Sequence, residues 1–229
     1  MTAVSNECAW GLFGDNYGSK LECPSLHAGL GATGVAGLSK PGKHFKQELL
    51  NLRRMTSVIV LVRDKDSGEL RFDKYGEPRL YYNLSEHDRT SMLDGLEKAI
   101  RIAAASGVEA VGTTQTALGT LRVLPPMSMV EARAAAVDGL VADVRRVGFP
   151  LYSASLYSAH QMGTCKMGSS AQTSVVNADG QNWEVSGLFV SDASVFPTSS
   201  GSNPMITTLG IAHMVAQQIR RQLHPSSRL

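Results

Sequence analysis

Apolar residues recur with the three-to-four-residue spacing of a helical face in two central stretches of the chain. The first stretch begins at Ser85, a good N-cap residue, and stops at Gly107. The second begins at the capping-box pair Ser128 and Glu131 and stops at Gly148. Their apolar positions are Met92, Leu93, Leu96, Ile100 and Ala103, then Val130, Ala134, Val137, Val141 and Val144. We predict two amphipathic helices, each with one buried face.

A third helical stretch begins at Asn203-Pro204 and runs to about Arg221. Proline suits the first position of a helix, where a missing N–H leaves no hydrogen bond unmade. The apolar positions of this stretch are Met205, Leu209, Ala212 and Ala216. Because they share one face, we predict an interior helix with that face buried.

Runs of β-branched and apolar residues indicate the strands. Thr56–Asp64 predicts a largely buried strand, which a turn at Asp64–Gly68 connects to a returning strand at Arg79–Leu84. Leu151–Gly168 predicts a strand that leads into a tight turn, and Leu188–Val190 predicts a short buried strand. The glycine-rich segment up to about Lys46 predicts loops with at most short strands. The fold class is therefore α/β, a sheet covered by helices.

Composition narrows the class of protein. Of 229 residues, 43% are hydrophobic and 18% are charged, with 22 basic and 20 acidic side chains. This balance excludes a disordered chain, and scattered basic residues argue against a nucleic-acid-binding protein. Three cysteines without a CxxC pair fit neither a disulfide framework nor a zinc site. With no apolar run near ~20 residues and no signal-peptide pattern, we expect an intracellular globular protein, soluble or peripherally bound to a membrane.

The segment Gly29–Gly34 matches the GxGxxG motif of dinucleotide-binding proteins. The motif works only between a strand and a helix, with an acidic residue about twenty positions later. Here Pro24 interrupts the segment before it and Pro41 the segment after it, and Arg53 stands where the acid is expected. We predict a loop and not a phosphate-binding turn.

Two further kinds of site are incomplete. A Ser-His-Asp hydrolase would need the GxSxG elbow, which the sequence lacks. A metal site built from His160, Cys165 and His213 would lack the paired spacing that zinc ligands usually have. We therefore predict neither a Ser-His-Asp hydrolase site nor a zinc site.

Three polar residues near the C-terminus are candidates for chemistry, each with a structural alternative. His160 lies between small residues and a glycine turn, where an imidazole can act as acid or base, or it is a satisfied core histidine. Asn203 either caps a helix or donates from its amide to a substrate oxygen, with the helix dipole favouring negative charge. Asp192 ends a predicted strand, where α/β folds bind ligands, or it is held by a turn.

Three C-terminal motifs, in this order and spacing, resemble the glucose-methanol-choline (GMC) oxidoreductases, a family of flavoenzymes. They are SAHQMGTCKMG at Ser158–Gly168, GLFVSDASVFP at Gly187–Pro197, and NPMITT at Asn203–Thr208. Within that family the first motif and Trp183–Val190 resemble long-chain fatty alcohol oxidases of the plant type. The resemblance begins at about Ser19 and is strongest in Tyr157–Ile219.

The resemblance implies an FAD-dependent oxidation of a long-chain primary alcohol to the aldehyde, with O2 reduced to H2O2. It implies that His160 is the catalytic base and that Asn203 hydrogen-bonds the alcohol oxygen. Asp192 and Ala193 match the segment that contacts the cofactor, and Asn203, Pro204 and Met205 would place a helix N-terminus at the flavin. The fatty-alcohol subgroup also implies peripheral membrane association.

The resemblance further implies a division of the chain. Residues 1–150 would be part of a substrate-binding α+β domain with an antiparallel sheet. Residues 151–229 would be the C-terminal segment of an FAD-binding Rossmann-like domain. The N-terminal Rossmann unit of full-length members is not present in this sequence, so the expected partner is a missing FAD-binding half. Two alternatives remain, a GMC oxidase or dehydrogenase for another alcohol, and a non-catalytic truncated module that binds an apolar ligand or a partner.

Overall fold

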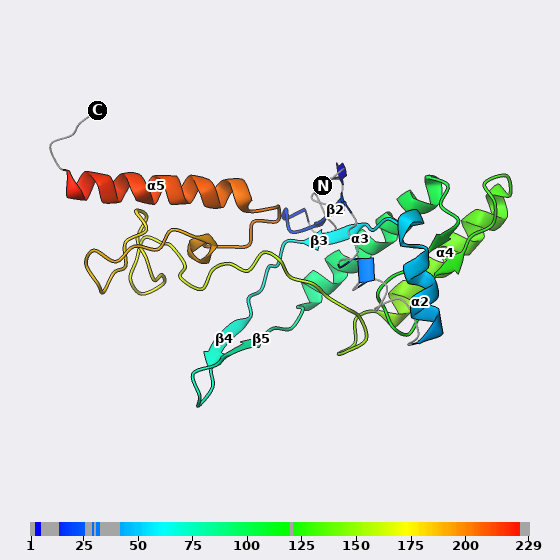
Figure 1. Cartoon of the computed structure of the whole chain (residues 1–229), viewed down its shortest axis with the longest axis horizontal. Coiled ribbons are helices and arrows are strands. Elements are labelled where there is room, and N and C mark those ends of the chain that lie inside the picture. Colours follow the sequence, from blue (N-terminus) through cyan, green and yellow to red (C-terminus); the bar gives the residue numbers. More distant parts are fainter. Residues whose placement is uncertain are drawn as a thin grey trace. The chain divides into compact units, whose positions relative to one another are not determined.

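The computed structural model describes residues 14–25, 29, 31–32, 42–119 and 121–224, together with the backbone of 3–5. The chain forms two compact units. Unit 1 comprises Met1–Val62 and Leu84–Tyr157, and unit 2 comprises Arg63–Asn83 and Ser158–Leu229. In Figure 1 unit 2 contains the cyan hairpin and the yellow-to-red segment that ends in helix α5. The expected domain boundary at residue 150 stays a prediction.

The sheet of unit 1 has three antiparallel strands in the order β1 (Ala3–Ser5), β2 (Ser19–Cys23) and β3 (Ile59–Val62). Helix α3 (Glu86–Ala105) packs on β2 and β3. Gly95 permits this close approach, because a Cβ there would lie 2.3 Å from Ser19 Oγ and 2.5 Å from Val60 Cγ1. A glycine in the middle of α3 therefore sets the spacing between the helix and the sheet.

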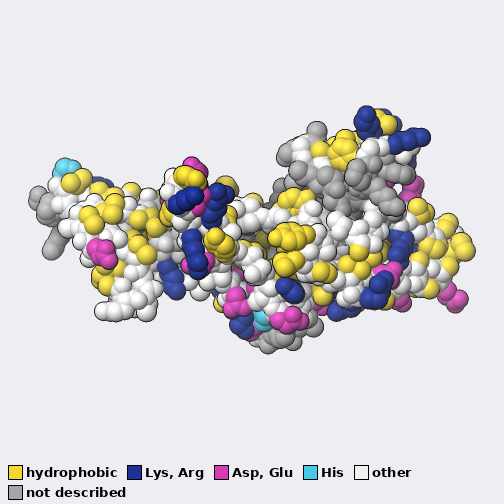
Figure 2. All heavy atoms as spheres, turned by 90° about the horizontal axis from the view of Figure 1, so that it is seen from below, with side chains coloured by type: hydrophobic (Ala, Val, Ile, Leu, Met, Phe, Trp, Pro, Cys, Tyr) yellow, Lys and Arg dark blue, Asp and Glu magenta, His cyan; other side chains and the backbone are white. Residues whose placement is uncertain are grey.

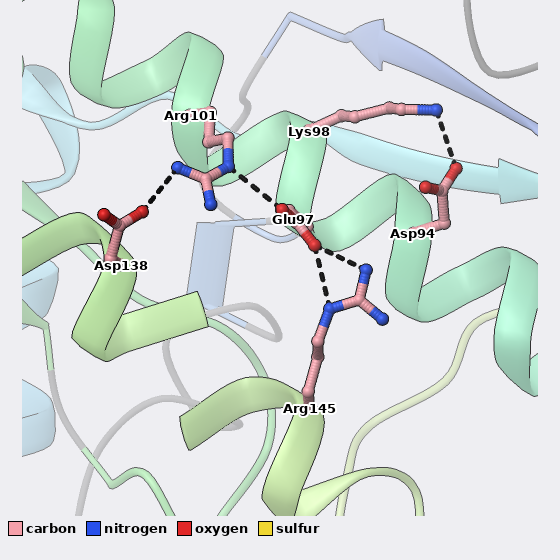
Figure 3. A network of polar contacts seen from close by, with 6 residues as sticks. All are labelled: Asp94, Glu97, Lys98, Arg101, Asp138 and Arg145. Carbon is pink, nitrogen blue, oxygen red and sulfur yellow. Dashed lines mark hydrogen bonds and ion pairs between the residues drawn. The ribbon is translucent and has the colours of Figure 1, made fainter. Parts of the chain in front are cut away.

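The main core of unit 1 lies between α3 and α4 (Val130–Val147), beside the short strands β6 (Ala110–Val111) and β7 (Arg122–Val123). Its buried members are Ile100, Ala104, Leu124, Val137, Leu140, Val141 and Val144. On the exposed side of α3 and α4, Glu97 accepts from Arg101 and Arg145, and Arg101 also donates to Asp138 (Figure 3). Unit 1 also contains α2 (Lys43–Leu50) and the 3-10 turn η2 (Leu52–Arg54).

Unit 2 consists of a hairpin, a looped segment and one long helix. The hairpin pairs β4 (Glu69–Phe72) with β5 (Pro78–Tyr81). The looped segment includes the 3-10 turn η3 (Ala193–Val195) and leads to α5 (Met205–Leu223). Among the described residues of unit 2, four apolar side chains are buried, namely Val176, Val195, Phe196 and Val215. Hydrophobic side chains are nonetheless scattered over the surface of the part that carries α5, at the left of Figure 2.

Mixed helices and small antiparallel sheets confirm the predicted fold class, but the predicted strand pairing is wrong. β3 is shorter than Thr56–Asp64, is only partly buried, and pairs with β2. The strand at Pro78–Tyr81 pairs instead with Glu69–Phe72, because a tight turn joins these two. In that turn Asp73 Oδ1 accepts from the backbone N–H groups of Tyr75 and Glu77, and Gly76 has a φ of 82°.

The helix predictions are confirmed in outline and wrong in part. Ser85 Oγ accepts from Asp88 N, and Gly107 and Gly148 follow the ends of α3 and α4 with positive φ. Ser128 does not cap α4, however, since the turn from Pro126 O to Met129 N starts the helix at Val130, one residue later than a Ser128 cap requires. The buried face of α4 is rotated accordingly. Val130 and Ala134 are exposed, while Arg133 and Leu140 join Val137, Val141 and Val144 as its buried residues.

The C-terminal elements also differ from expectation. α5 is not an interior helix, because Met205 and Leu209 are 66% and 60% exposed and Val215 is the buried residue of α5. Leu188–Val190 forms one isolated bridge, between Phe189 and Gln181, and not a strand. Leu151–Gly168 is a run of turns and loop with isolated bridges. Glycines with positive φ, Gly187 just before the first segment and Gly163 within the second, turn the chain, and pairing is limited to isolated bridges.

The GxGxxG segment falls partly outside the described residues, which include Gly29, Gly31 and Ala32. These three are helical, so the prediction of a loop is wrong for them. The preceding strand β2 is antiparallel to both neighbours, unlike the parallel strands of a Rossmann unit. Gly31 is explained by packing, because a Cβ there would lie 2.3 Å from Leu52 Cδ1.

Across the described parts of the chain, none of the helices has the length and apolar character needed to cross a bilayer.

Candidate active site

The six predicted site residues all lie in unit 2, at three positions along its second stretch, Ser158–Leu229. His160 is in the loop that begins unit 2's second stretch. Asp192 directly precedes η3, and Ala193 is the first residue of η3. Helix α5 begins at Met205 and is preceded by Asn203 and Pro204. The site therefore depends on how these three positions are held.

The His160 loop is paired with η3 through the backbone. Gly163 N donates to Ala193 O at 3.3 Å, Cys165 N to Ser194 O at 2.9 Å, and Met167 N to Val195 O at 2.9 Å. Three donors at every second residue of the loop thus meet three consecutive carbonyl groups of the 3-10 turn. It fixes the turn that follows His160 against Asp192 and Ala193.

His160 is half-buried, and the loop folds closely around it. Gln161 Nε2 donates to Ser158 O at 2.9 Å and to Ser158 Oγ at 3.2 Å, which closes the chain on either side of the histidine. Gly163 then turns the chain with a φ of 88°, a conformation that favours glycine. His160 is thus carried by a short loop whose backbone path these contacts define. Its half-buried side chain can be reached by solvent or a ligand.

Asp192 caps η3, and it does not end a strand as the sequence suggested. Its Oδ1 accepts from Ser194 N at 2.8 Å. Hydrogen bonds from the side chain and then the backbone of Ser194 lower the pKa of the Asp192 carboxyl below its ordinary value, although partial burial opposes them. The carboxylate is therefore charged at neutral pH and is engaged in holding the backbone of η3.

The start of α5 has the features of an open helix end. Pro204 is the N-cap, and its carbonyl accepts from Thr208 N at 2.8 Å and Thr208 Oγ1 at 2.9 Å. The N-cap residue is therefore Pro204 and not Asn203, and Pro204 makes no side-chain cap bond. Asn203 and Met205 are both exposed. The positive end of the helix dipole thus meets the surface beside an amide and an apolar side chain.

The pairing with η3 brings the His160 loop to Asp192 and Ala193, whereas Asn203–Met205 belong to a separate element. The loop of residues 196–202 connects them, and its anchor was missed by sequence reasoning. Arg63 Nε donates to Ser199 O at 3.1 Å, and Ser199 Oγ donates to Asp64 O at 2.7 Å. No motif signals a bond between residues 136 positions apart. The one available hint is the glycine in the serine-rich loop.

Comparisons with known proteins identify the family. The family model described as GMC oxidoreductase matches residues 64–212. Two long-chain-alcohol oxidases of Arabidopsis thaliana are 34% and 32% identical over 205 and 196 residues, which is 89% and 83% of this chain. The chain spans 27% and 25% of the length of these two relatives.

A similar solved structure is pyridoxine 4-oxidase from Mesorbium loti, which is 23% identical with a TM-score of 0.48 and covers 72% of this chain and 30% of that one. The family match includes the hairpin, the His160 loop, η3 and the first part of α5, as far as residue 212. Because the family match covers more than half of the 229 residues of the chain, the chain belongs to the GMC oxidoreductase family.

Proposed function

We propose that this chain carries the catalytic base and the cofactor-facing segments of an FAD-dependent oxidase of long-chain primary alcohols. Relatives named as long-chain-alcohol oxidases, 34% and 32% identical over most of the chain, support the substrate class. One structural observation supports the site, the backbone pairing that sets the His160 loop against Asp192 and Ala193. The loop of the proposed base and two of the cofactor-facing residues, Asp192 and Ala193, are thereby held together.

The start of α5 fits a flavin ring by the chemistry of the groups it exposes. The first turn presents backbone N–H groups that no side chain caps, and they favour an anionic ring edge. Met205 and Ile206, 66% and 72% exposed, offer an apolar surface to a planar ring. A bound flavin supplies the acceptor for the hydride that leaves the alcohol carbon.

The protein's own part in this reaction is to bind, orient and deprotonate the alcohol. The His160 imidazole takes the hydroxyl proton, since neutral histidine is the usual base near pH 7. The Asn203 amide N–H donates to the alcohol oxygen and fixes its direction. The alcohol loses this proton and a hydride to become the aldehyde, and O2 takes up two electrons and two protons to become H2O2.

Asp192 is a poor alternative base for the same step. Its carboxylate already accepts the Ser194 backbone hydrogen bond that caps η3, and its pKa is held below the ordinary aspartate value. A base with so low a pKa binds a proton weakly at neutral pH. His160 is therefore the better candidate for the base.

The test compares alcohol-dependent peroxide formation by the flavin-containing holoenzyme and its His160→Gln variant. We expect turnover to fall about 100-fold or more, as is typical when a general base is removed. The matched control is His213→Gln, because His213 is an exposed histidine of α5 outside the proposed machinery. Near-normal turnover by His160→Gln would overturn the assignment of the base.

The substrate class is tested separately with primary alcohols of increasing chain length. We expect kcat/KM to rise with chain length, since each buried methylene contributes about 0.8 kcal/mol. A preference for short or polyhydroxy alcohols would leave a GMC oxidoreductase of another specificity. No flavin reduction by any alcohol would favour the non-catalytic module.

A further inference from the structure

The loop before α5 is clamped by Arg63 and Asp64, which follow strand β3 in sequence and belong to unit 2. Arg63 Nε donates to Ser199 O at 3.1 Å, and Ser199 Oγ donates back to Asp64 O at 2.7 Å. The two bonds run in opposite directions between the same two short segments. One residue of the loop is therefore held through both its backbone carbonyl and its side chain.

Gly201 lets the stem of Arg63 lie directly on this loop. A Cβ on Gly201 would be 2.8 Å from Cδ, 2.9 Å from Cβ and 3.0 Å from Cγ of Arg63. Because Cβ and Cγ lie near the backbone, they cannot swing away as the end of a long side chain can. Gly201 also has a φ of 61°, which favours glycine. Space and backbone conformation thus both require glycine under the arginine.

The clamped loop leads directly to the open end of α5. Within it Ser200 Oγ donates to Ser202 O at 2.5 Å, which keeps the turn compact as far as Asn203. Pro204, the N-cap of the helix, supplies no side-chain cap. The contact with Arg63 therefore anchors the loop from which Asn203 and the first turn of α5 continue.

We propose that Arg63 is a positioning residue, which holds the Ser199–Ser202 loop so that Asn203 and the first turn of α5 point at the reacting alcohol and the flavin. This inference rests on the proposed function for its catalytic consequence, and on the clamp itself for its structural one. Arg63 acts through the loop and takes no part in the proposed proton transfer. Loss of the clamp therefore lowers turnover without moving the pH dependence that His160 sets.

The variants separate the hydrogen bond from the packing. Arg63→Met keeps the stem that covers Gly201 and removes the donor to Ser199 O. Gly201→Ala keeps the donor and displaces the stem of Arg63, so it weakens the same contact by changing the loop. It replaces Arg63→Met as the test variant if Arg63→Met folds poorly. Arg71→Met is the control, since Arg71 is an exposed hairpin arginine paired with Glu69.

The first measurement is hydrogen exchange of peptides that cover residues 199–210 in the holoenzyme. Thr208 N is the first amide of α5 bonded to the helix backbone. We expect Arg63→Met to speed its exchange about tenfold, the effect of one lost hydrogen bond to a charged donor, and Arg71→Met to leave it unchanged. Exchange unchanged in both Arg63→Met and Gly201→Ala, or changed equally by Arg71→Met, would overturn the clamp.

The second measurement is the steady-state oxidation of a long-chain alcohol as a function of pH. We expect Arg63→Met to lower kcat about tenfold with the midpoint of the pH profile unmoved, and Arg63→Lys to recover part of the loss. A normal kcat despite faster exchange would overturn the positioning role. If exchange responds as expected while the wild-type protein oxidises no alcohol, the clamp is supported and the proposed function fails.

Discussion

Gly180 attaches α5 to the rest of unit 2, and replacing it should release the helix. A Cβ on Gly180 would lie 2.5 Å from Val215 Cγ2 and 3.0 Å from Val190 O. Val215 is fully buried and is the buried residue of α5. The chain also turns at Gly180 with a φ of 80°, and Gly180 O accepts from Val190 N at 2.9 Å. Gly180→Ala therefore introduces both a backbone strain and a clash.

The two effects have separable sizes. A left-handed conformation costs a residue with a Cβ about 1–2 kcal/mol. Overpacking a filled site costs about 1–3 kcal/mol more. We expect Gly180→Ala to lower the free energy of unfolding of unit 2 by about 2–5 kcal/mol. Gly187→Ala is the matched control, because Gly187 has a φ of 79° but nothing within 4 Å of a Cβ, so it should lose only the strain.

The assay is urea unfolding followed by tryptophan fluorescence. Trp183 reports on unit 2, where its Nε1 donates to Ser174 Oγ at 2.9 Å. Adding Val215→Ala to Gly180→Ala should relieve part of the clash. The double variant should therefore be more stable than the sum of the two single effects predicts. If Gly180→Ala destabilises no more than Gly187→Ala, the packing of α5 through this glycine is refuted.

Two further predictions concern unit 1. Arg133, 7% exposed, donates to Ala104 O, Val108 O and Pro125 O. Arg133→Met should therefore lower the free energy of unfolding by about 3 kcal/mol, while the exposed control Arg146→Met should change it by less than about 1 kcal/mol in the same urea titration. Hydrogen bonds from Arg145, then from Arg101, lower the pKa of Glu97 in the folded protein. The ionised Glu97 therefore stabilises the fold above the ordinary glutamate pKa, and this contribution is lost as the pH falls through the lower pKa of the folded state. As the pH is lowered below the ordinary glutamate pKa of about 4.5, stability should fall less steeply in Glu97→Gln than in the wild type, and equal slopes would contradict the coupling.

Sequence reasoning identified features that are decided within a few residues. The cap at Ser85 and the helix stop at Gly107 depend on local backbone geometry, so they could be predicted. The burial of α5 could not, because it depends on one contact between Val215 and Gly180, 35 positions earlier in the chain. The partner of β3 was missed because β2, far back in a glycine-rich segment, provides it.

The candidate site divides in the same way. His160 and Asn203 could be proposed as site residues because each lies in a compact motif that resembles a family. Asp192 also lies in such a motif, but the sequence could not show that its carboxylate caps η3, since that depends on the angle at which the chain turns there. Arg63 carries no local signal, because its partner Ser199 becomes its neighbour only after the chain has folded.

The most direct test of the account is single-turnover reduction of the bound flavin by a long-chain primary alcohol without oxygen. This measurement isolates the proposed proton transfer to His160 from the later reaction with O2. The account predicts rapid bleaching in the wild-type and His213→Gln holoenzymes and bleaching about 100-fold slower or more in His160→Gln. Equal rates in the His160→Gln and wild-type proteins would contradict it.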